Sequence, residues 1–190
     1  MSTSSLSIGR QSFAALRIFV VLTVLVGVIY PAAVWGVGRI AFHSQATGSL
    51  ITRDGKVVGS SLLGQQFTGP QWFQGRASAS NYAGNASGGS NLPEDDKRQQ
   101  QAVAQRRAAL SSLGGKIPPD ALTESASGLD PDISPAYAQL QAPRVAKARG
   151  LSLAVVEHLI SEYTQGRDAG FLGDPRVNFL ELNLALQKLQ

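Results

Sequence analysis

The stretch IFVVLTVLVGVIYPAAVWGVG, residues 18–38, contains no charged side chain. As a helix that rises 1.5 Å per residue, about 21 residues reach across the roughly 30 Å hydrocarbon core of a bilayer. A helix on the surface of a soluble protein would carry a polar stripe, which this stretch lacks. The sequence therefore predicts one transmembrane helix over residues 15–38.

A cleaved signal peptide is the alternative interpretation, because the most aliphatic part, residues 18–29, is only about 12 residues long. Signal peptidase requires small residues at positions −3 and −1 from the cut. The best register here places Pro31 at −3, where it fits poorly. We therefore favour an uncleaved membrane anchor.

The positive charges around the helix indicate its orientation. Arg10 and Arg17 precede the uncharged stretch 18–38 without any acidic neighbour, whereas Arg39 alone lies close behind it. Cytoplasmic flanks of membrane helices carry the excess of Lys and Arg. We therefore expect a cytoplasmic tail over residues 1–14 and an extracytoplasmic soluble domain over residues 39–190.

Small residues recur on one side of the predicted helix. Small side chains at a spacing of four let helix backbones approach closely in lipid, where packing drives association. No ionisable side chain lies in the segment, so the helix is expected to pack against a partner helix rather than to carry ions. The predicted packing positions form two neighbouring stripes: Thr23, Gly27 and Pro31, then Ala32 and Gly36.

Composition excludes several classes of function. The formal net charge is only +4, from 17 Lys and Arg against 13 Asp and Glu, and no dense basic patch is present. We therefore expect no nucleic-acid partner. The chain has no cysteine, which excludes disulfides, thiolate metal sites, a cysteine nucleophile and an acylated N-terminal cysteine.

The soluble domain is predicted to be α+β, with a β-hairpin in its first half and helices in its second. Asp54-Gly55 between two apolar pairs is typical of a type I′ hairpin turn. Residues 75–91 are dominated by Gly, Ala, Ser and Asn, which predicts a loop. Asn91 is then expected to cap a helix, with Pro93 in its first turn and Glu94 completing a capping box.

Further caps and breakers divide the second half. Ser134 is expected to begin a helix that Pro143 interrupts and Gly150 closes. Ser152 is expected to cap a helix with one apolar face, and Asp174-Pro175 to begin the last helix.

The sequence contains no complete catalytic or metal-binding set. The spacing G-x-x-x-x-G-K-[ST] and the elbow G-x-S-x-G are both absent. His43 and His158 are the only histidines, which leaves open a hydrolase that pairs a serine with His158. Asp130 and Asp132 could contribute to a hard-cation site, although Asp-Pro turns of this kind are common. We therefore predict no catalytic residue and no metal ligand.

Two polar stretches are weaker candidates for binding. Ser87-Gly88-Gly89-Ser90 could form a backbone nest for an anion, although acidic residues 94–96 would repel a phosphate there. Arg144, Lys147 and Arg149 form either a solvated helix face or a docking patch.

A series of short motifs carries more information than periodicity does. In order and spacing they resemble the C subunit of the Kdp-type potassium-transporting P-type ATPase, from about Leu16 to the end of the chain. The matching segments are Tyr30-Pro31, Gly48-Ser49-Leu50-Ile51, Val58-Gly59-Ser60, Leu63-Gly64-Gln65 with Phe67, Phe73 with Arg76, Ser87-Gly88-Gly89-Ser90-Asn91-Leu92, Ser125 to Pro131, Ile133 to Ala136, Pro143 to Leu151, Gly170 to Asn178 and Leu182 to Leu186.

The resemblance implies a non-catalytic accessory subunit of an ATP-driven potassium importer in the bacterial inner membrane. The implied partners are a channel-like subunit that selects K⁺, a P-type ATPase subunit and a small single-helix subunit. In that family the C subunit is described as an assembly factor and as a catalytic chaperone that raises the nucleotide affinity of the ATPase subunit. Potassium itself would be handled by the partner subunits.

The resemblance also implies a candidate nucleotide site, because the family's Ser-Gly-Gly stretch has been likened to the signature of ABC transporters. Here ATP would contact Ser87, Gly88, Gly89, Ser90 and Asn91. The stretch lacks the signature's leading Leu and closing Gln. An extracytoplasmic loop also could not meet cytosolic ATP, so the expected effect on the ATPase is a conformational coupling, with direct nucleotide binding as the alternative.

Overall fold

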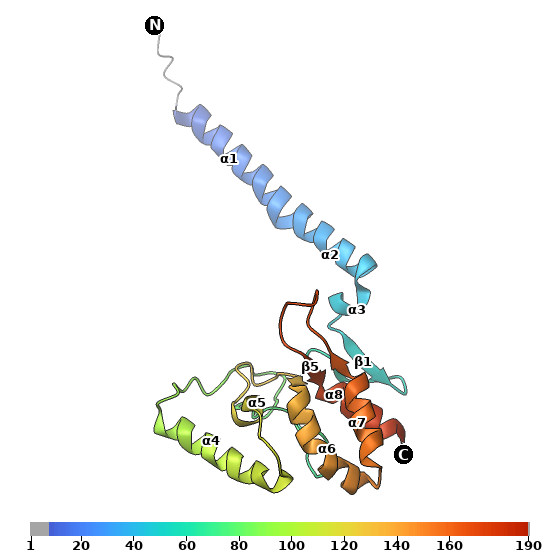
Figure 1. Ribbon diagram of the computed structural model, residues 1–190. Helices are drawn as coiled ribbons and strands as arrows, with labels where there is room; N and C mark the ends of the chain where they lie inside the picture. The colour runs from blue at the N-terminus through green and yellow to red at the C-terminus, as the bar shows by residue number, and fades with distance from the viewer. Residues whose placement is uncertain (1–7, 190) are drawn as a thin grey trace. The chain divides into compact units, whose positions relative to one another are not determined.

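The structure is a computed structural model that describes residues 8–189 (Figure 1). The chain divides into two compact units, of which the first ends at Ser49 and the second begins at Leu50. The first unit contains α1 (Ile8–Val24), η1 (Leu25–Ile29), α2 (Tyr30–Ala41) and α3 (His43–Ala46). The second contains β1 (Leu50–Arg53), β2 (Lys56–Ser60), α4 (Lys97–Leu110), η2 (Ser111–Leu113), α5 (Pro119–Leu122), β3 (Asp132–Ile133), α6 (Pro135–Arg149), α7 (Leu153–Glu162), β4 (Thr164–Gln165), β5 (Arg176–Asn178), α8 (Phe179–Leu186) and η3 (Gln187–Leu189).

The first three elements form one continuous helix from Ile8 to Ala41. Within residues 8–189 it is the one helix that is long and apolar enough to cross a membrane, and none of its residues is buried. This agrees with the single-pass arrangement that the sequence predicts. The helix contains the whole predicted segment 15–38 and begins before it, whereas residues 1–7 of the predicted tail lie outside the described part.

A π turn interrupts the regular α-helix just before Pro31. Pro31 has no N–H to donate, and its ring would clash with the carbonyl of Gly27 in a regular helix. The turn, Leu25–Ile29, widens the helix so that the Tyr30 N–H donates to the Leu25 carbonyl five residues back. Such adjustments keep backbone groups satisfied where lipid offers no partner.

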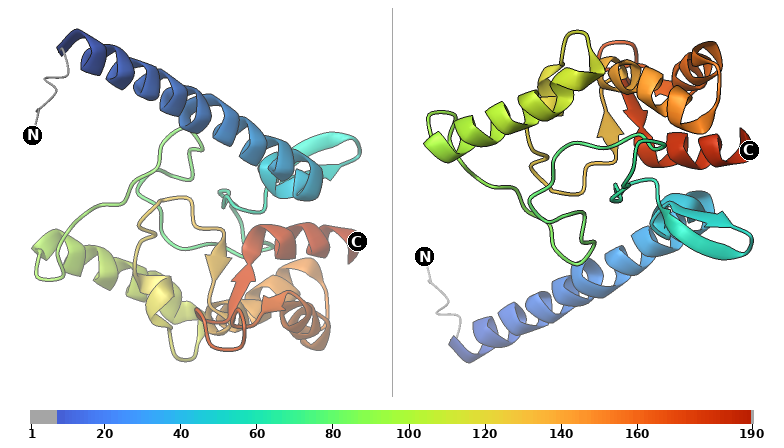
Figure 2. Two further views of the ribbon diagram at one scale, coloured as in Figure 1. Left: turned by 90° about the horizontal axis from the view of Figure 1, so that it is seen from above. Right: turned by 90° about the horizontal axis from the view of Figure 1, so that it is seen from below.

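The predicted hairpin is confirmed. Strands β1 and β2 pair antiparallel around Asp54 and Gly55, whose φ angles of 50° and 74° are the two positive values that a type I′ turn requires. With helices following, the domain is α+β, as the sequence predicts. Figure 2 shows the long loops and α4 in views from above and below.

A second small sheet escaped prediction. It has the order β3-β5-β4, with antiparallel pairing throughout. Its strands are two or three residues long, which is too short for an alternation of apolar and polar residues to be recognised in the sequence. The prediction that the last helix begins at Asp174-Pro175 is wrong, because residues 176–178 form β5. Helix α8 begins at Phe179, after Asn178 accepts hydrogen bonds from the N–H groups of Leu180 and Glu181.

The predicted start of the helix over residues 97–110 is also wrong. Asn91 has a φ of 52° and lies in the loop, so it caps no helix. A turn closed by the Asp96 N–H on the Pro93 carbonyl at 3.1 Å delays the helix. Asp96 caps it by accepting from the Arg98 N–H at 2.7 Å, and its hydrogen bonds to Arg98 lower its pKa to about 2.

Pro143 does not interrupt helix α6, contrary to the prediction. Pro143 and Gln139, whose carbonyl loses its helical donor, are both exposed, so water can solvate that carbonyl. Buried residues on either side hold the helix against the core. The predicted caps are confirmed, because Ser134 accepts from the Tyr137 N–H and Gly150 ends the helix with a φ of 67°.

The core lies between α6, α7, α8 and β5. On α7 the predicted apolar face is confirmed for Val156, Leu159 and Ile160, whereas Val155 is 42% exposed. The large hydrophobic side chains that are fully buried come from residue 73 and from α6, α7, β5 and α8: Phe73, Val145, Val156, Ile160, Val177, Phe179, Leu180, Leu182 and Leu186.

Residues 71–74 form an irregular segment that brings Phe73 into the core, and no strand pairs with this segment. Side chains take the place of that strand. Asn183 from α8 accepts from the Phe73 N–H at 2.9 Å and donates to the Phe73 carbonyl at 2.8 Å. Gln141 from α6 does the same for Gln74, at 2.8 and 3.0 Å. Both amide side chains are at most 1% exposed.

Two arginines of α6 complete the pairing of this segment. Arg144 donates to the Trp72 carbonyl at 3.0 Å, and Arg149 donates to the Gln71 carbonyl at 2.8 Å. The Arg149 guanidinium also stacks 4.3 Å from the centre of the Trp72 ring. Burial lowers the pKa of both arginines. Neither arginine is simply a solvated residue of an exposed helix face, whereas Lys147 is exposed.

Replacing Asn183 with Ala should destabilise the second unit by about 2–5 kcal/mol, because it leaves the buried N–H and carbonyl of Phe73 without partners. Chemical unfolding of the full chain in detergent, followed by Trp72 fluorescence, measures the loss. The matched control is Asn85→Ala, at an exposed loop position. Equal stability of the two variants would contradict the pairing role of Asn183.

Candidate functional site

The loop singled out by the sequence, residues 87–91, lies against the neighbouring loop 125–128. The Gly88 N–H donates to the Ser127 carbonyl at 2.8 Å, and the Ser87 hydroxyl donates to the same oxygen at 3.1 Å. A Cβ on Gly89 would lie 3.1 Å from the Ala126 carbonyl oxygen, so this glycine allows the close approach. The loop is therefore held to a second loop.

The same geometry bears on the predicted anion nest. The Gly88 N–H already has a partner in the Ser127 carbonyl. Helix α4 begins only at Lys97, so residues 87–91 do not lead directly into the positive end of a helix dipole. The helix start is occupied by the Asp96 carboxylate, which would repel a phosphate.

A shallow cavity of about 210 Å³ lies beside this loop. The Oε2 atom of Glu124 and the Oε1 atom of Gln99 are buried there without a hydrogen-bond partner. Both are acceptors, so the cavity suits a hydrogen-bond donor rather than a phosphate. Its lining is Gly89, Ser90, Asn91, Leu92, Gln99, Thr123, Glu124, Ser125 and Ala126.

Arg76 connects the loops of this region. Its guanidinium forms an ion pair with Asp130 at 3.0 Å and donates to the Glu124 carbonyl at 3.0 Å and the Thr123 hydroxyl at 3.2 Å. The Ser78 hydroxyl donates to the Gly128 carbonyl at 2.6 Å. Residues 76–78 and 123–130 are thereby fixed to each other.

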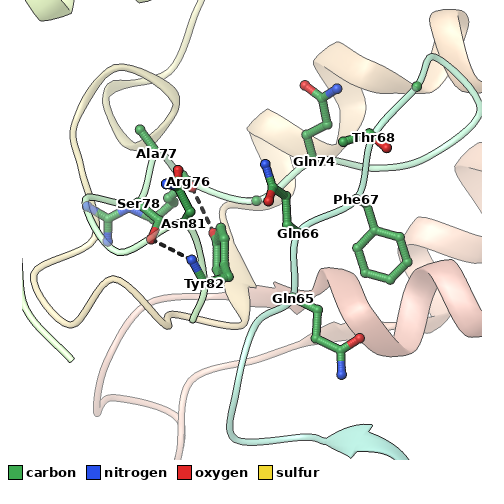
Figure 3. A pocket seen from close by; sticks show the side chains of 12 residues that line it. Gln65, Gln66, Phe67, Thr68, Gln74, Arg76, Ala77, Ser78, Asn81 and Tyr82 are labelled. Atoms are coloured by element: carbon green, nitrogen blue, oxygen red, sulfur yellow. Dashed lines mark hydrogen bonds between the residues drawn. The ribbon is translucent and has the colours of Figure 1, made fainter. Parts of the chain in front are cut away.

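An open polar pocket of about 360 Å³ lies on the other side of Arg76, and Figure 3 shows its lining. Gln65, Gln66 and Gln74 are among its lining residues, and the Gln65 amide donates to the Val58 carbonyl at 2.8 Å. Tyr82 donates through its hydroxyl to the Arg76 carbonyl at 2.7 Å, and burial raises the pKa of that hydroxyl. The tyrosine is therefore a neutral structural donor.

The backbone around this pocket is constrained. Asn81 and Tyr82 both adopt positive φ angles, 52° and 57°, which cost energy for residues other than glycine. Gly75 allows the packing, since a Cβ there would lie 2.4 Å from the Tyr82 hydroxyl oxygen and 2.5 Å from the Phe179 ring. The pocket is thus part of a tightly fitted loop structure.

The two aspartates considered for a cation site line the same cavity, but each of them is paired with an arginine. Asp130 pairs with Arg76, and Asp132 lies 3.6 Å from Arg176. Burial raises the pKa of Asp132, which disfavours the ionised form a hard cation needs. Across residues 8–189 no group of three or more His, Asp or Glu side chains is placed to hold a metal ion.

The remaining candidates are isolated. His158 is exposed on α7, and His43 lies in α3 of the first unit. On the membrane helix, a Cβ on Gly27 would meet only the Thr23 methyl group at 4.0 Å, and one on Gly36 would meet nothing within 4 Å. The predicted packing stripes through Pro31 and Ala32 therefore lie open on the exposed helix, with the π turn between Thr23 and Pro31.

The sequence did not single out the amide side chains that hold the centre of the domain. Asn183 lies in the apolar run Leu182-Asn183-Leu184-Ala185-Leu186, and a polar residue on an otherwise buried face was the signal available. Arg76 was noted only as part of a motif.

Comparison with known proteins identifies the family. A family model described as KdpC, K⁺-transporting ATPase, c chain, matches residues 12–188. A protein of Kineococcus radiotolerans named potassium-transporting ATPase KdpC subunit is 48% identical and covers 98% of both chains. Proteins of the same name from Paraburkholderia phytofirmans and Mycobacterium tuberculosis are 49% and 47% identical, over 91% and 95% of this chain and 94% and 99% of theirs.

These matches span both units and nearly the whole length of the relatives. They confirm the resemblance that the motifs indicate, and with it an accessory subunit rather than the catalytic one. The chain belongs to the KdpC family, the c chain of K⁺-transporting ATPases.

Proposed function

We propose that the chain is a membrane-anchored accessory subunit that assembles and stabilises an ATP-driven potassium importer in the bacterial inner membrane. Its partners are a channel-like K⁺-selecting subunit, a P-type ATPase subunit and a small single-helix subunit. The observation that carries this proposal is the match to one subunit family over residues 12–188. The single candidate membrane helix within residues 8–189 supports it.

In this proposal, the first unit binds the channel-like subunit in the membrane, and the second unit covers the outer surface of that subunit. The membrane helix packs through its small residues against the channel-like subunit, and the soluble domain lies over the outer mouth of that subunit. Potassium selection and ATP hydrolysis belong to the partners. The effect on the ATPase is that of a catalytic chaperone, which raises nucleotide affinity by coupling two conformations rather than by touching ATP.

Direct nucleotide binding through residues 87–91 is the second candidate. The unpartnered acceptors of Glu124 and Gln99 beside the loop favour a ligand that donates hydrogen bonds, such as a ribose hydroxyl. The loop's hydrogen bonds to Ser127 and the carboxylate cap of α4 argue against a site for the triphosphate.

The orientation of the domain separates the two candidates, and the chain's lack of cysteine allows a clean test. A Ser112→Cys variant places one thiol at an exposed position of the second unit. We expect a membrane-impermeant maleimide to label it in intact spheroplasts. Ser5→Cys, in the predicted cytoplasmic tail, should be labelled only after permeabilisation, and the reverse pattern would refute the proposed topology.

The contribution of the packing stripes on the membrane helix to assembly can be measured with a Gly27→Leu variant. The larger side chain should separate the packed backbones and weaken assembly by about 1–2 kcal/mol, comparable with other interhelical contacts in bilayers. The readout is the fraction of the complex retained through purification in mild detergent. Ala33→Leu, outside the two stripes, adds similar bulk and should leave assembly unchanged; equal loss in both variants would count against the stripe.

Nucleotide dependence provides a third measurement. A complex that lacks the chain should lose about 5- to 150-fold in ATP affinity, the usual range of conformational coupling. Ser87→Ala in the full complex should leave the KM for ATP within about twofold of the wild-type value, because coupling does not require that hydroxyl to touch ATP. A large rise in KM from Ser87→Ala alone, with assembly intact, would favour direct binding.

A further inference from the structure

The segment between β4 and β5 presents two large apolar side chains to solvent. Phe171 is 71% exposed and Leu172 is 54% exposed, although the nearby Val177 of β5 is fully buried. Exposed aromatic side chains on ordered loops are typical of binding surfaces rather than of structural support. The rest of the domain gives no reason for this exposure.

The segment is an ordered hairpin. The backbone groups of Asp168 and Leu172 exchange two hydrogen bonds of 2.9 Å, which closes a tight turn. Ala169 and Gly170 form that turn with φ angles of 52° and 83°. The two apolar side chains are therefore presented on a preformed tip, and little conformational freedom remains to be lost on binding.

Paired charges surround the tip. Arg167 lies 3.1 Å from Asp174, and Arg176 lies 3.6 Å from Asp168. Arg176 also lies 3.6 Å from Asp132, so each charge around the apolar tip has an opposite charge beside it. This is the composition of a protein-protein contact, in which an apolar anchor is surrounded by polar residues that exclude water.

The same charges argue against insertion into lipid. Membrane-interface loops carry Trp or Tyr with unpaired Lys or Arg, which attract anionic headgroups. Here the tip has neither, and the Asp168 and Asp174 side chains are 72% and 90% exposed. Exposed carboxylates would be repelled by an anionic lipid surface.

The hairpin lies at one end of the second unit. Figure 1 shows the loop that leads into β5 projecting from the end of the domain at which β1 begins. Strand β1 is where the chain arrives from the predicted membrane segment, through residues 42–49. Within the second unit, the hairpin therefore lies near the point at which the chain enters the domain.

We propose that the hairpin of residues 167–174 is the docking element of the domain. It inserts Phe171 and Leu172 into an uncharged apolar pocket on the outer surface of another subunit of the complex. This inference rests on the proposed function, since it needs an assembled complex and an extracytoplasmic domain.

The direct test replaces Phe171 with p-benzoylphenylalanine in the full chain, followed by irradiation of membranes that contain the assembled complex. We expect a covalent adduct with one other subunit of the complex, identified by mass spectrometry. The matched control carries the same residue at Leu153, an exposed position on α7 that is 41% accessible and should give no such adduct. An adduct with lipid only, with a second copy only, or no adduct at position 171 would overturn the proposal.

A second variant measures the energetic contribution. Phe171→Ala should accelerate dissociation of the chain from the complex by at least about tenfold, the effect of losing one anchor residue. Its thermal unfolding should match that of the wild type, because the side chain is exposed, and Leu153→Ala should change neither property. If the wild-type chain fails to co-purify with the ATPase, the proposed function itself fails; if it co-purifies and Phe171→Ala dissociates at the wild-type rate, only the hairpin inference fails.

Discussion

The constraint on which the domain depends is the pairing of residues 71–74 by side chains instead of by a strand. Buried backbone groups must find partners, and an extended segment normally finds them in a neighbouring strand. Here Asn183 and Gln141 each present an amide group that copies the donor and acceptor of a peptide unit. Through these bonds, α8 and α6 are fixed to a segment that lies more than sixty residues earlier in the chain. Each amide side chain pairs with the backbone of one residue, and the two residues are one peptide unit apart.

This pairing explains how a domain with so little sheet keeps long loops in place. Phe73 is fully buried between the helices, and the chain that follows it leads directly to Arg76. Arg76 in turn holds the loop that contains Asp130, and that loop holds residues 87–91 through Ser127. Each loop is fixed by the one before it, so the order of the Gly- and Ser-rich region originates in the two buried amides.

The sequence was sufficient where the local signal was strong and independent of distant contacts. The apolar run, the Asp54-Gly55 turn and the cap at Ser134 are such signals, and the structure agrees with all three. The sequence did not predict the features whose formation depends on tertiary contacts. Helix α6 tolerates Pro143 because water can solvate the Gln139 carbonyl, which loses its helical donor. The short strand at Val177 forms only because β3 and β4 pair with it on both sides.

The candidate site also depends on contacts that its local sequence does not reveal. A Ser-Gly-Gly stretch can cradle a phosphate only if its N–H groups are free and a helix dipole stands behind them. In residues 87–91 the Gly88 N–H is already bound to the Ser127 carbonyl, and the helix that follows starts six residues later behind the Asp96 carboxylate. Glycine at position 89 allows close packing against Ala126, which is a structural reason for the motif that requires no nucleotide.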